Sequence, residues 1–229
     1  MPDSTLKFYL CRTFEPSMEN PVIIFGANYL GRQAKDILEN NGNVIYCFLD
    51  DNKKLHNTII DEITVMGSTD DDGYLKLIGK KCDAVVAIDD FKVRKSIVNM
   101  LQEERHVQPA NVISKLAFVA GSAEIGHGNF FDHQVVISAG ASIGNHSILQ
   151  AGCIVGPEAK VGDFVQIGAG SIVNAGCEIE NEVFIGTGVT VVGGISIGKG
   201  ARIGAGSVVI TPVKAGDTVF GNPAQSVKS

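Results

Sequence analysis

"IVGPEAKVGDFVQIG" (Ile154–Gly168) places an aliphatic residue at every sixth position: Val155, Val161 and Ile167. The same step of six continues in both directions through the second half of the chain. Its members are Ile113, Val119, Ile125, Phe131, Ile137, Ile143, Leu149, Val155, Val161, Ile167, Val173, Ile179, Ile185, Val191, Ile197, Ile203 and Val209. An unbroken period of six predicts hexapeptide units that stack as a parallel β-helix.

Each unit is expected to form one short strand and one corner, with its aliphatic residue pointing into a narrow prism. The residue four places further on is usually small or branched, as at Ala141, Cys153 and Cys177, and fits where the corner is tight. Stacked coils pair their backbones about 4.8 Å apart, so no unit is stable alone. Both cysteines are therefore predicted to lie in the core.

Before residue 110 the pattern alternates short apolar runs with helical stretches. Strands are predicted over 21–26, 43–50 and 80–89, and helices over 28–40 and 91–104. This alternation favours a Rossmann-like parallel sheet covered on both faces. The chain is divided into an N-terminal extension (1–20), the α/β domain (21–110), the β-helix (111–214) and a C-terminal cap or tail (215–229).

Composition excludes several classes of partner. With 19 basic and 25 acidic residues among 229, the net charge is −6, which disfavours nucleic acid. No apolar run reaches the roughly 18 residues that span a bilayer. The five cysteines form no CxxC pair, so reduced thiols in a cytoplasm are expected and no metal site is. The first 17 residues do not resemble a secretory signal, and Met18 is an alternative start.

A glycine-rich turn follows the first predicted strand, from Gly26 to Gly31. Glycines there let backbone N–H groups approach a phosphate at a helix N-terminus. Asp50 ends the second strand 24 residues after Gly26, where an acidic residue meets a ribose hydroxyl in such folds. The alternative is that the two glycines only permit a tight turn and close helix packing. Lys53 either lies in a solvated turn or reaches a phosphate.

The two halves together resemble the bacterial sugar acyltransferases. The residues that carry the resemblance are VIIFGANYLGRQAKDIL, CFLDDNKK and DAVVAIDDFKVRKSI, then the hexapeptide column and a terminal GNPA. The relatives are sialic-acid O-acetyltransferases and bacillosamine and perosamine N-acetyltransferases, over about residues 20 to 226. The resemblance implies a left-handed β-helix and a homotrimer with active sites between neighbouring columns. It also implies acetyl-CoA as donor and a nucleotide-linked sugar held by the N-terminal domain.

Carried over to this sequence, the nucleotide contacts of the family fall on Gly26, Ala27, Asp50, Asp51 and Lys53. The family's AIGDN stretch is AIDDF here, with Asp89 in place of the glycine.

The positions that carry the family's chemistry have changed. The general-base histidine of the family corresponds to Pro157, and Glu158 occupies the adjacent acidic position, which orients that histidine in the family. A second family histidine, near the acetyl group, corresponds to Gln166, and Ala175 and Gly176 fall at acetyl-CoA-binding positions. An upstream family asparagine is replaced by glutamine.

Two residues are candidates for the missing base. Glu158 could serve only if desolvation raised its pKa, and its alternative is a solvated corner carboxylate. His133 follows Asp132 at the same phase of its hexapeptide as Pro157 but on another edge, so it would act from a neighbouring subunit. The alternative for His133, as for His127 and His146, is a surface corner.

A positioned base contributes typically about 10²- to 10⁴-fold, and alignment of the reactants can supply more. Because a sugar amine with a near-neutral pKa is partly deprotonated already, loss of the histidine favours an amine acceptor. The sequence therefore predicts an acetyltransferase acting on a nucleotide-linked amino sugar in surface-glycan synthesis. The alternatives are a catalytically silent trimeric nucleotide-sugar-binding protein and a purely structural β-helix.

Overall fold

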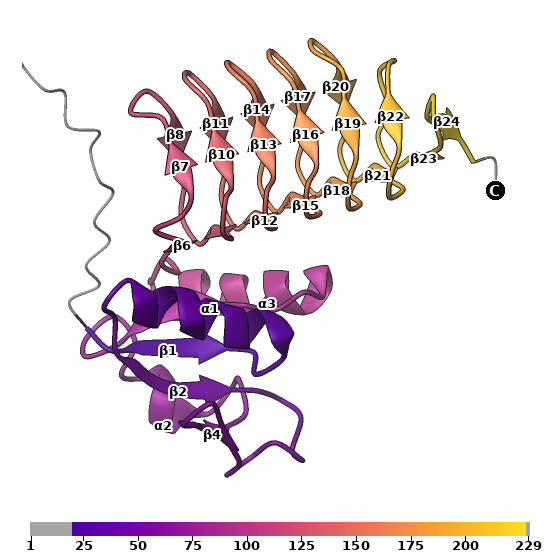
Figure 1. Cartoon of the computed structure of the whole chain (residues 1–229). Coiled ribbons are helices and arrows are strands. Elements are labelled where there is room, and N and C mark those ends of the chain that lie inside the picture. The colour runs from indigo at the N-terminus through magenta and orange to yellow at the C-terminus, as the bar shows by residue number, and fades with distance from the viewer. Residues whose placement is uncertain (1–19, 228–229) are drawn as a thin grey trace, which may run out of the picture.

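A computed structural model of the chain describes residues 20–227 (Figure 1). Cys11, Met18 and the predicted N-terminal extension up to residue 19 lie outside these residues. The described chain forms an α/β unit followed by a long column of short strands (Figure 1). The helices α1 and α3 cover opposite faces of the sheet, and both contact the column.

The α/β unit contains one five-stranded sheet in the order β3-β4-β2-β1-β5. Its elements are β1 (Val22–Phe25), α1 (Tyr29–Asn40), β2 (Ile45–Leu49), β3 (Ile59–Ile60), β4 (Ile63–Gly67), α2 (Asp72–Leu75), β5 (Asp83–Val86) and α3 (Phe91–Glu103). The four longer strands are parallel, and β3 is antiparallel to β4. One apolar cluster joins the sheet to α1 and a second joins its other face to α2 and α3. The predicted strands, helices and two-sided covering are confirmed.

The column consists of three sheets, one on each side of the prism. The side that faces the α/β unit is called the inner face. It contains β6 (Val112–Ile113), β9 (Phe130–Phe131), β12 (Ile148–Leu149), β15 (Gln166–Ile167), β18 (Phe184–Ile185), β21 (Arg202–Ile203), β23 (Thr218–Phe220) and β24 (Gln225–Ser226). The apolar face contains β7 (Phe118–Val119), β10 (Val136–Ile137), β13 (Ile154–Val155), β16 (Ile172–Val173), β19 (Thr190–Val191) and β22 (Val208–Val209). The polar face contains β8 (Glu124–Ile125), β11 (Ser142–Ile143), β14 (Lys160–Val161), β17 (Glu178–Ile179) and β20 (Ser196–Ile197).

The period of six is the period of these strands. Each aliphatic residue of the series is the second residue of a two-residue strand, and those from Phe131 to Val209 are all buried. Cys153 and Cys177 are also fully buried, which confirms their core positions. At the end of the column β23 pairs with β21 in parallel and β24 folds back on β23, so the aperiodic C-terminal segment caps the prism.

The outward residues of the strands differ between the three faces. On the inner face, Val112, Phe130 and Ile148 are buried in the same apolar cluster as α1, so the column and the α/β unit share a core. The polar face presents Glu, Ser and Lys side chains. The apolar face presents Phe118, which is 53% exposed, and Ile154, which is 37% exposed.

Candidate functional site

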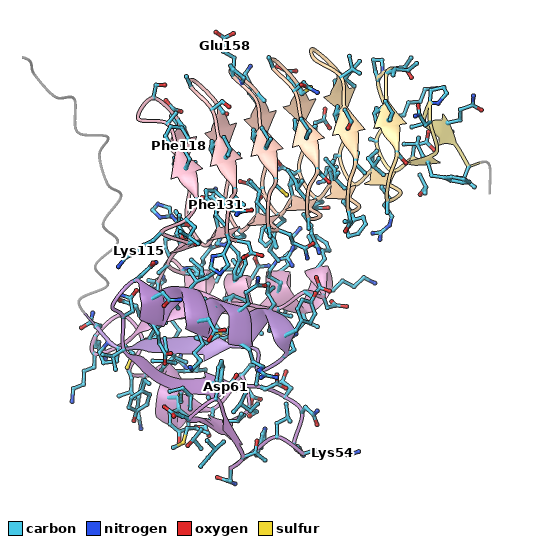
Figure 2. The ribbon with its side chains drawn as sticks, in the orientation of Figure 1. Lys54, Asp61, Lys115, Phe118, Phe131 and Glu158 are labelled. Atoms are coloured by element: carbon cyan, nitrogen blue, oxygen red, sulfur yellow. The ribbon has the colours of Figure 1, made fainter. Side chains whose placement is uncertain are left out.

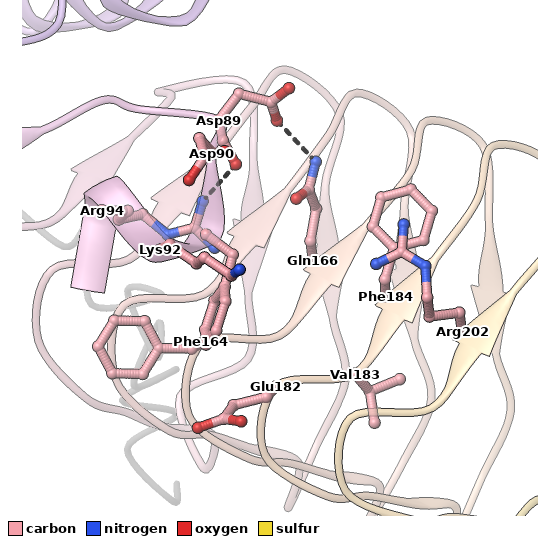
Figure 3. Close-up of a pocket in the computed structure, with 11 residues that line it drawn as sticks. Asp89, Asp90, Lys92, Arg94, Phe164, Gln166, Glu182, Val183, Phe184 and Arg202 are labelled. Atoms are coloured by element: carbon pink, nitrogen blue, oxygen red, sulfur yellow. Dashed lines mark hydrogen bonds between the residues drawn. The ribbon is translucent and has the colours of Figure 1, made fainter. Parts of the chain in front are cut away.

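A cleft of about 430 Å³ lies between the α/β unit and the inner face of the column (Figure 3). Its lining residues are Asp89, Asp90, Phe91, Lys92, Arg94, Phe164, Gln166, Glu182, Val183, Phe184 and Arg202. One wall is the turn from β5 into α3, and the other is the outward row of β15, β18 and β21. In an open parallel sheet, ligands bind beyond the carboxyl ends of the strands where the strand order reverses. Here that point is between β1 and β5, because β1 lies between β2 and β5.

The glycine turn between β1 and α1 packs directly against the turn that forms the cleft. A Cβ on Gly26 would lie 2.6 Å from the Ala87 carbonyl oxygen, and one on Gly31 would overlap the Gly26 carbonyl oxygen. Gly26 also has a φ of 101°, a conformation that favours glycine. Close packing therefore accounts for both glycines, whether or not the turn also meets a phosphate.

The predicted nucleotide residues of this turn are brought together. Asp50 accepts a hydrogen bond from the Ala27 N–H at 2.8 Å and another from the Asn52 N–H at 2.8 Å. Asn28 caps α1 by accepting from the N–H groups of Leu30 and Gly31. Asp50 thus fixes the conformation of the turn. The Asn28 side chain occupies the N–H groups at the start of α1 that were expected to meet a phosphate.

Asp51 and Lys53 lie beyond this turn. Asp51 accepts hydrogen bonds from the Thr69 N–H and hydroxyl, both at 2.8 Å, and so joins the ends of β2 and β4. Lys53 is exposed in the following turn. Neither side chain lines the cleft.

On the column side, the cleft begins where the α/β unit stops covering the inner face. The outward row changes there from buried apolar residues to Gln166, Phe184 and Arg202. The Gln166 Nε2 donates to the Asp89 carboxylate at 2.9 Å across the cleft (Figure 3). The Arg202 guanidinium lies over the Phe184 ring, 4.5 Å from its centroid. Gln166 is therefore a residue of the cleft.

Arg94 holds the turn that carries Asp89. Its guanidinium is buried, with the residue only 1% exposed, and its Nη1 donates to the carbonyl oxygens of Ile88 and Asp89 at 2.8 and 3.1 Å. Burial lowers the pKa of Arg94 to about 10, although the negative charges of Asp89 and Asp90 act to raise it. On the other side of the turn, burial and then the Asp89 carboxylate raise the pKa of Tyr29 to about 12, so its phenol stays protonated at neutral pH.

The α3-facing edge of the column, formed by Gly128, His146, Phe164, Glu182 and Gly200, closes the base of the cleft. Phe164 contacts the Phe91 ring edge-on with centroids 5.9 Å apart, and the Glu182 carboxylate pairs with the Lys95 ammonium at 2.7 Å. His146 is 3% exposed, so the expectation of a surface corner was wrong for this residue, because α3 covers it. His127 is exposed, as expected.

The predicted base Glu158 lies on the opposite side of the prism. It is an exposed corner of the outer edge, formed by Gly140, Glu158, Gly176 and Gly194, and points away from the α/β unit (Figure 2). Ala175 and Gly176 follow it one coil further along, where the Gly176 N–H donates to the Pro157 carbonyl at 2.9 Å. These three predicted residues are neighbours, but Gln166 is on a different face.

His133 lies on the third edge, which confirms that it does not share an edge with Pro157. Its Nδ1 is 2.6 Å from the Ser114 hydroxyl, and its backbone N–H donates to the Asp132 carboxylate. The other oxygen of Asp132 accepts from the Gln33 side chain of α1 at 2.6 Å. The aspartate thus joins the column to α1 and does not orient the His133 ring.

Sequence reasoning did not find most of the cleft. The residues it missed are Asp90, Phe91, Lys92, Arg94, Phe164, Glu182, Val183, Phe184 and Arg202. A period of 18 on the inner face gives a usable signal, because Val112, Phe130 and Ile148 are followed by Gln166, Phe184 and Arg202. Within residues 20–227, no group of three His, Cys, Asp or Glu residues is placed to hold a metal ion, and no helix is long and apolar enough to cross a membrane.

Comparison with known protein families matches both parts of the chain. Residues 21–101 match the PglD N-terminal domain, and residues 158–193 and 176–211 match the bacterial transferase hexapeptide repeat. The chain thus pairs a PglD-type N-terminal domain with hexapeptide repeats. These two matches confirm the resemblance read from the sequence. No curated protein matches the chain.

Solved structures of this PglD-like type match nearly the whole chain. WeeI from Acinetobacter baumannii is 27% identical with a TM-score of 0.80, covering 90% of this chain and 99% of that one. The acetyltransferase domain of PglB from Neisseria gonorrhoeae is 25% identical with a TM-score of 0.83, covering 91% and 100%. The same domain has been solved with acetyl coenzyme A.

A variant of perosamine N-acetyltransferase from Caulobacter crescentus, in complex with CoA and GDP-perosamine, is 23% identical with a TM-score of 0.84, covering 92% and 98%. This last likeness concerns the fold, and it confirms the expected Rossmann-like domain followed by a left-handed β-helix.

Proposed function

We propose that this PglD-like protein transfers an acetyl group from acetyl-CoA to the amine of a nucleotide-linked amino sugar, in the synthesis of a bacterial surface glycan. The observation that carries the proposal is the cleft between the two parts of the chain. It lies at the reversal point of the sheet, where nucleotide ligands bind in such folds, and its other wall is the hexapeptide column. The neighbouring structures with acetyl coenzyme A, CoA and GDP-perosamine support the same pair of substrates.

In this proposal the α/β unit holds the nucleotide sugar. Gly26, Ala27 and Asp50 form the turn beside the cleft, and Asp51 and Lys53 lie further along the same side of the sheet. A volume of about 430 Å³ is at the lower end of the range for ligand pockets. We infer that it takes the sugar, while the nucleotide extends over these residues.

The acetyl-CoA side of the proposal requires a second copy of the chain. Glu158, Ala175 and Gly176 lie on the outer edge, whereas Gln166 faces the cleft on another side of the same prism. A neighbouring column that places its outer edge against the cleft would unite them. The third-edge residue His133 would reach a site only in the same way.

The apolar face supports assembly into a homotrimer. Its outward row is Phe118, Val136, Ile154, Ile172, Thr190 and Val208, which is apolar in five of six positions. Exposed apolar patches of this kind mark protein interfaces. Both the outer edge and the edge of His133 border this face. Sedimentation analysis should give three copies, and Ile154→Asp should dissociate them, whereas a monomeric wild type would contradict the trimer.

The chemistry of attack favours an amine over a hydroxyl acceptor. A hydroxyl must lose its proton to attack the thioester, and by the resemblance Pro157 stands where the family has its base. A free amine attacks with its lone pair, the C–S bond breaks, and the thiolate of CoA takes up a proton while the new amide nitrogen loses one. Glu158 and His133 remain the proposed proton acceptors.

The first experiment is calorimetric titration of acetyl-CoA into the purified protein, because it requires no knowledge of the acceptor. Micromolar binding at one site per chain supports the transferase. Thiol release with a panel of nucleotide-linked amino sugars then follows, with Glu158→Ala and His133→Ala to identify the base. Absence of acetyl-CoA binding by a folded trimer would favour the second candidate, a catalytically silent nucleotide-sugar-binding protein. The resemblance, which places Pro157 and Gln166 at the positions of the two family histidines, supports this candidate.

A further inference from the structure

Asp89 is a carboxylate of the cleft that forms no ion pair among residues 20–227, and the nearby charge that attracts it is that of the buried Arg94. Among residues 20–227, no Lys, Arg or His nitrogen lies within 4.0 Å of its oxygens. Arg94, directly behind the turn, donates to backbone carbonyl oxygens and not to the carboxylate. The donor that reaches the carboxylate is the neutral amide of Gln166, with the protonated phenol of Tyr29 nearby.

The other two carboxylates of the cleft already have partners. Asp90 caps α3 by accepting from the Val93 N–H at 2.9 Å. Glu182 pairs with Lys95 at 2.7 Å. Asp89 is thus the carboxylate of the cleft that neither caps a helix nor pairs with a cation, and about three of its four acceptor positions are left for a ligand after the hydrogen bond from Gln166.

The cleft also contains cations without a carboxylate partner. Lys92 and Arg202 both line it, and neither forms an ion pair within the described part of the chain. A cleft with a carboxylate and cations that form no ion pair with one another is complementary to a ligand that carries both charges. A phosphate-linked sugar with an ammonium group is such a ligand.

We propose that Asp89 binds the acceptor amine as an ammonium ion and thereby selects amino sugars over sugars that carry a hydroxyl at the same position. This inference rests on the proposed function and names the residue that determines its substrate class. The Gln166 amide fixes the carboxylate across the cleft, and Arg94 fixes the turn behind it, so the group is held ready for the ligand. Before the nitrogen attacks, the ammonium gives one proton to Glu158 or His133, the proposed acceptors. The proton that the new amide nitrogen then loses goes to the thiolate of CoA.

The test compares binding of an amine with binding of its hydroxyl counterpart. GDP-perosamine and its UDP-linked equivalent are titrated into the full-length protein beside the same molecules with a hydroxyl in place of the amine. The wild type is expected to bind at least one amine more tightly than its counterpart. Asp89→Asn keeps an oxygen for Gln166 and is expected to weaken binding of the amine about 10- to 100-fold, as for a lost charge-assisted hydrogen bond, and the hydroxyl sugar little.

Asp90→Asn is the matched control. It removes one negative charge from the same cleft, and asparagine caps a helix as well as aspartate does. The preference for the amine should survive in this variant. A second readout is pH, because preference should fade as the amine loses its proton in the wild type and should be small at every pH in Asp89→Asn.

Equal binding of amine and hydroxyl sugars by the wild type would overturn the inference, as would equal loss of preference in Asp89→Asn and Asp90→Asn. Acetyl-CoA titration separates this failure from failure of the proposed function. If acetyl-CoA binds and the preference is absent, the transferase stands and Asp89 is not its amine site. If acetyl-CoA does not bind, the proposed transferase function is contradicted, whichever sugar Asp89 binds.

Discussion

The α3-facing edge and the outer edge of the column have the same backbone conformation. The first is covered by α3, and the second is exposed. Every sixth residue from Gly128 to Gly206 has a positive φ near 60–70°, the left-handed conformation in which glycine is favoured. The α3-facing edge places three successive non-glycine residues there, His146, Phe164 and Glu182. The outer edge has glycines except at Glu158.

Contacts with α3 offset the cost of a side chain in this left-handed conformation. At the α3-facing edge each side chain contacts α3 or its neighbour, because the Phe164 ring lies against Phe91 and His146 and the Glu182 carboxylate binds Lys95. At the outer edge Glu158 is exposed and makes no hydrogen bond or ion pair through its side chain among the described residues. A non-glycine residue in a costly conformation without compensating contacts is a candidate for function.

The strongest predicted effect concerns His146, which lies on the α3-facing edge and is kept from water by α3. Burial lowers its pKa to about 4, from an ordinary value of 6.5. Between these values the unfolded chain binds a proton that the folded chain does not, so stability is full above pH 6.5 and falls as the pH decreases toward 4. The loss amounts to about 3 kcal/mol.

Chemical denaturation at several pH values checks this dependence. His146→Asn cannot be protonated and tolerates a left-handed φ, so its stability should vary less over this range than that of the wild type. His127→Asn is the matched control, because this histidine is on the same edge but exposed. An unchanged pH slope in His146→Asn would show that α3 does not seal this edge.

The second effect is the removal of the Phe164 ring. Phe164→Gly relieves a left-handed non-glycine residue by about 1 kcal/mol but loses the contacts of the ring with Phe91 and His146. The net result should be destabilisation by about 2 kcal/mol, measured as a lower denaturation midpoint. A stabilised variant would mean that the ring contributes less than its backbone costs.

The comparison of edges also separates what the sequence predicts from what it does not. The column could be predicted residue by residue, because the buried member of each strand recurs every six residues and its burial is the condition for stacking. The alternation of strands and helices likewise predicted β1, α1, β2, β5 and α3. The strand β3 was missed because it has only two residues, and β4 was missed because it lies between the turn-forming residues of 61–62 and 68–71.

The cleft could not be predicted in the same way, since it depends on where one part of the chain stops covering the other. Gln166 was identified by resemblance to the family, and Asp89 as a departure from it. Arg94 is an interior residue of a predicted helix, and only the packing of α3 shows that it is buried behind the turn. His146 looked like any other polar corner residue until α3 was placed over it.

The third effect tests the outer edge by a pair of opposite substitutions. Glu158→Gly should stabilise the chain by about 1 kcal/mol, since it removes a strained side chain that has no contacts to lose. Gly176→Ala should destabilise it by about the same amount, because the new Cβ meets nothing within 4 Å and only the backbone conformation is penalised. Thermal denaturation of both variants measures these opposite changes in stability. Destabilisation by Glu158→Gly would reveal a contact to a neighbouring copy.

The smallest effect compares two Lys–Glu pairs of the column. Lys95–Glu182 joins α3 to the α3-facing edge, with side-chain exposures of 41% and 23%, whereas Lys160–Glu178 lies on the polar face with exposures of 68% and 61%. Exposed pairs contribute between about 0 and 1 kcal/mol, and more when partly desolvated. Lys95→Met should therefore cost about 0.5 kcal/mol, with part of that cost removed by high salt. Lys160→Met should cost nothing measurable. Equal costs would show that α3 is held to the column by its apolar contacts alone, and that Glu182 occupies its left-handed corner without compensation, as Glu158 does.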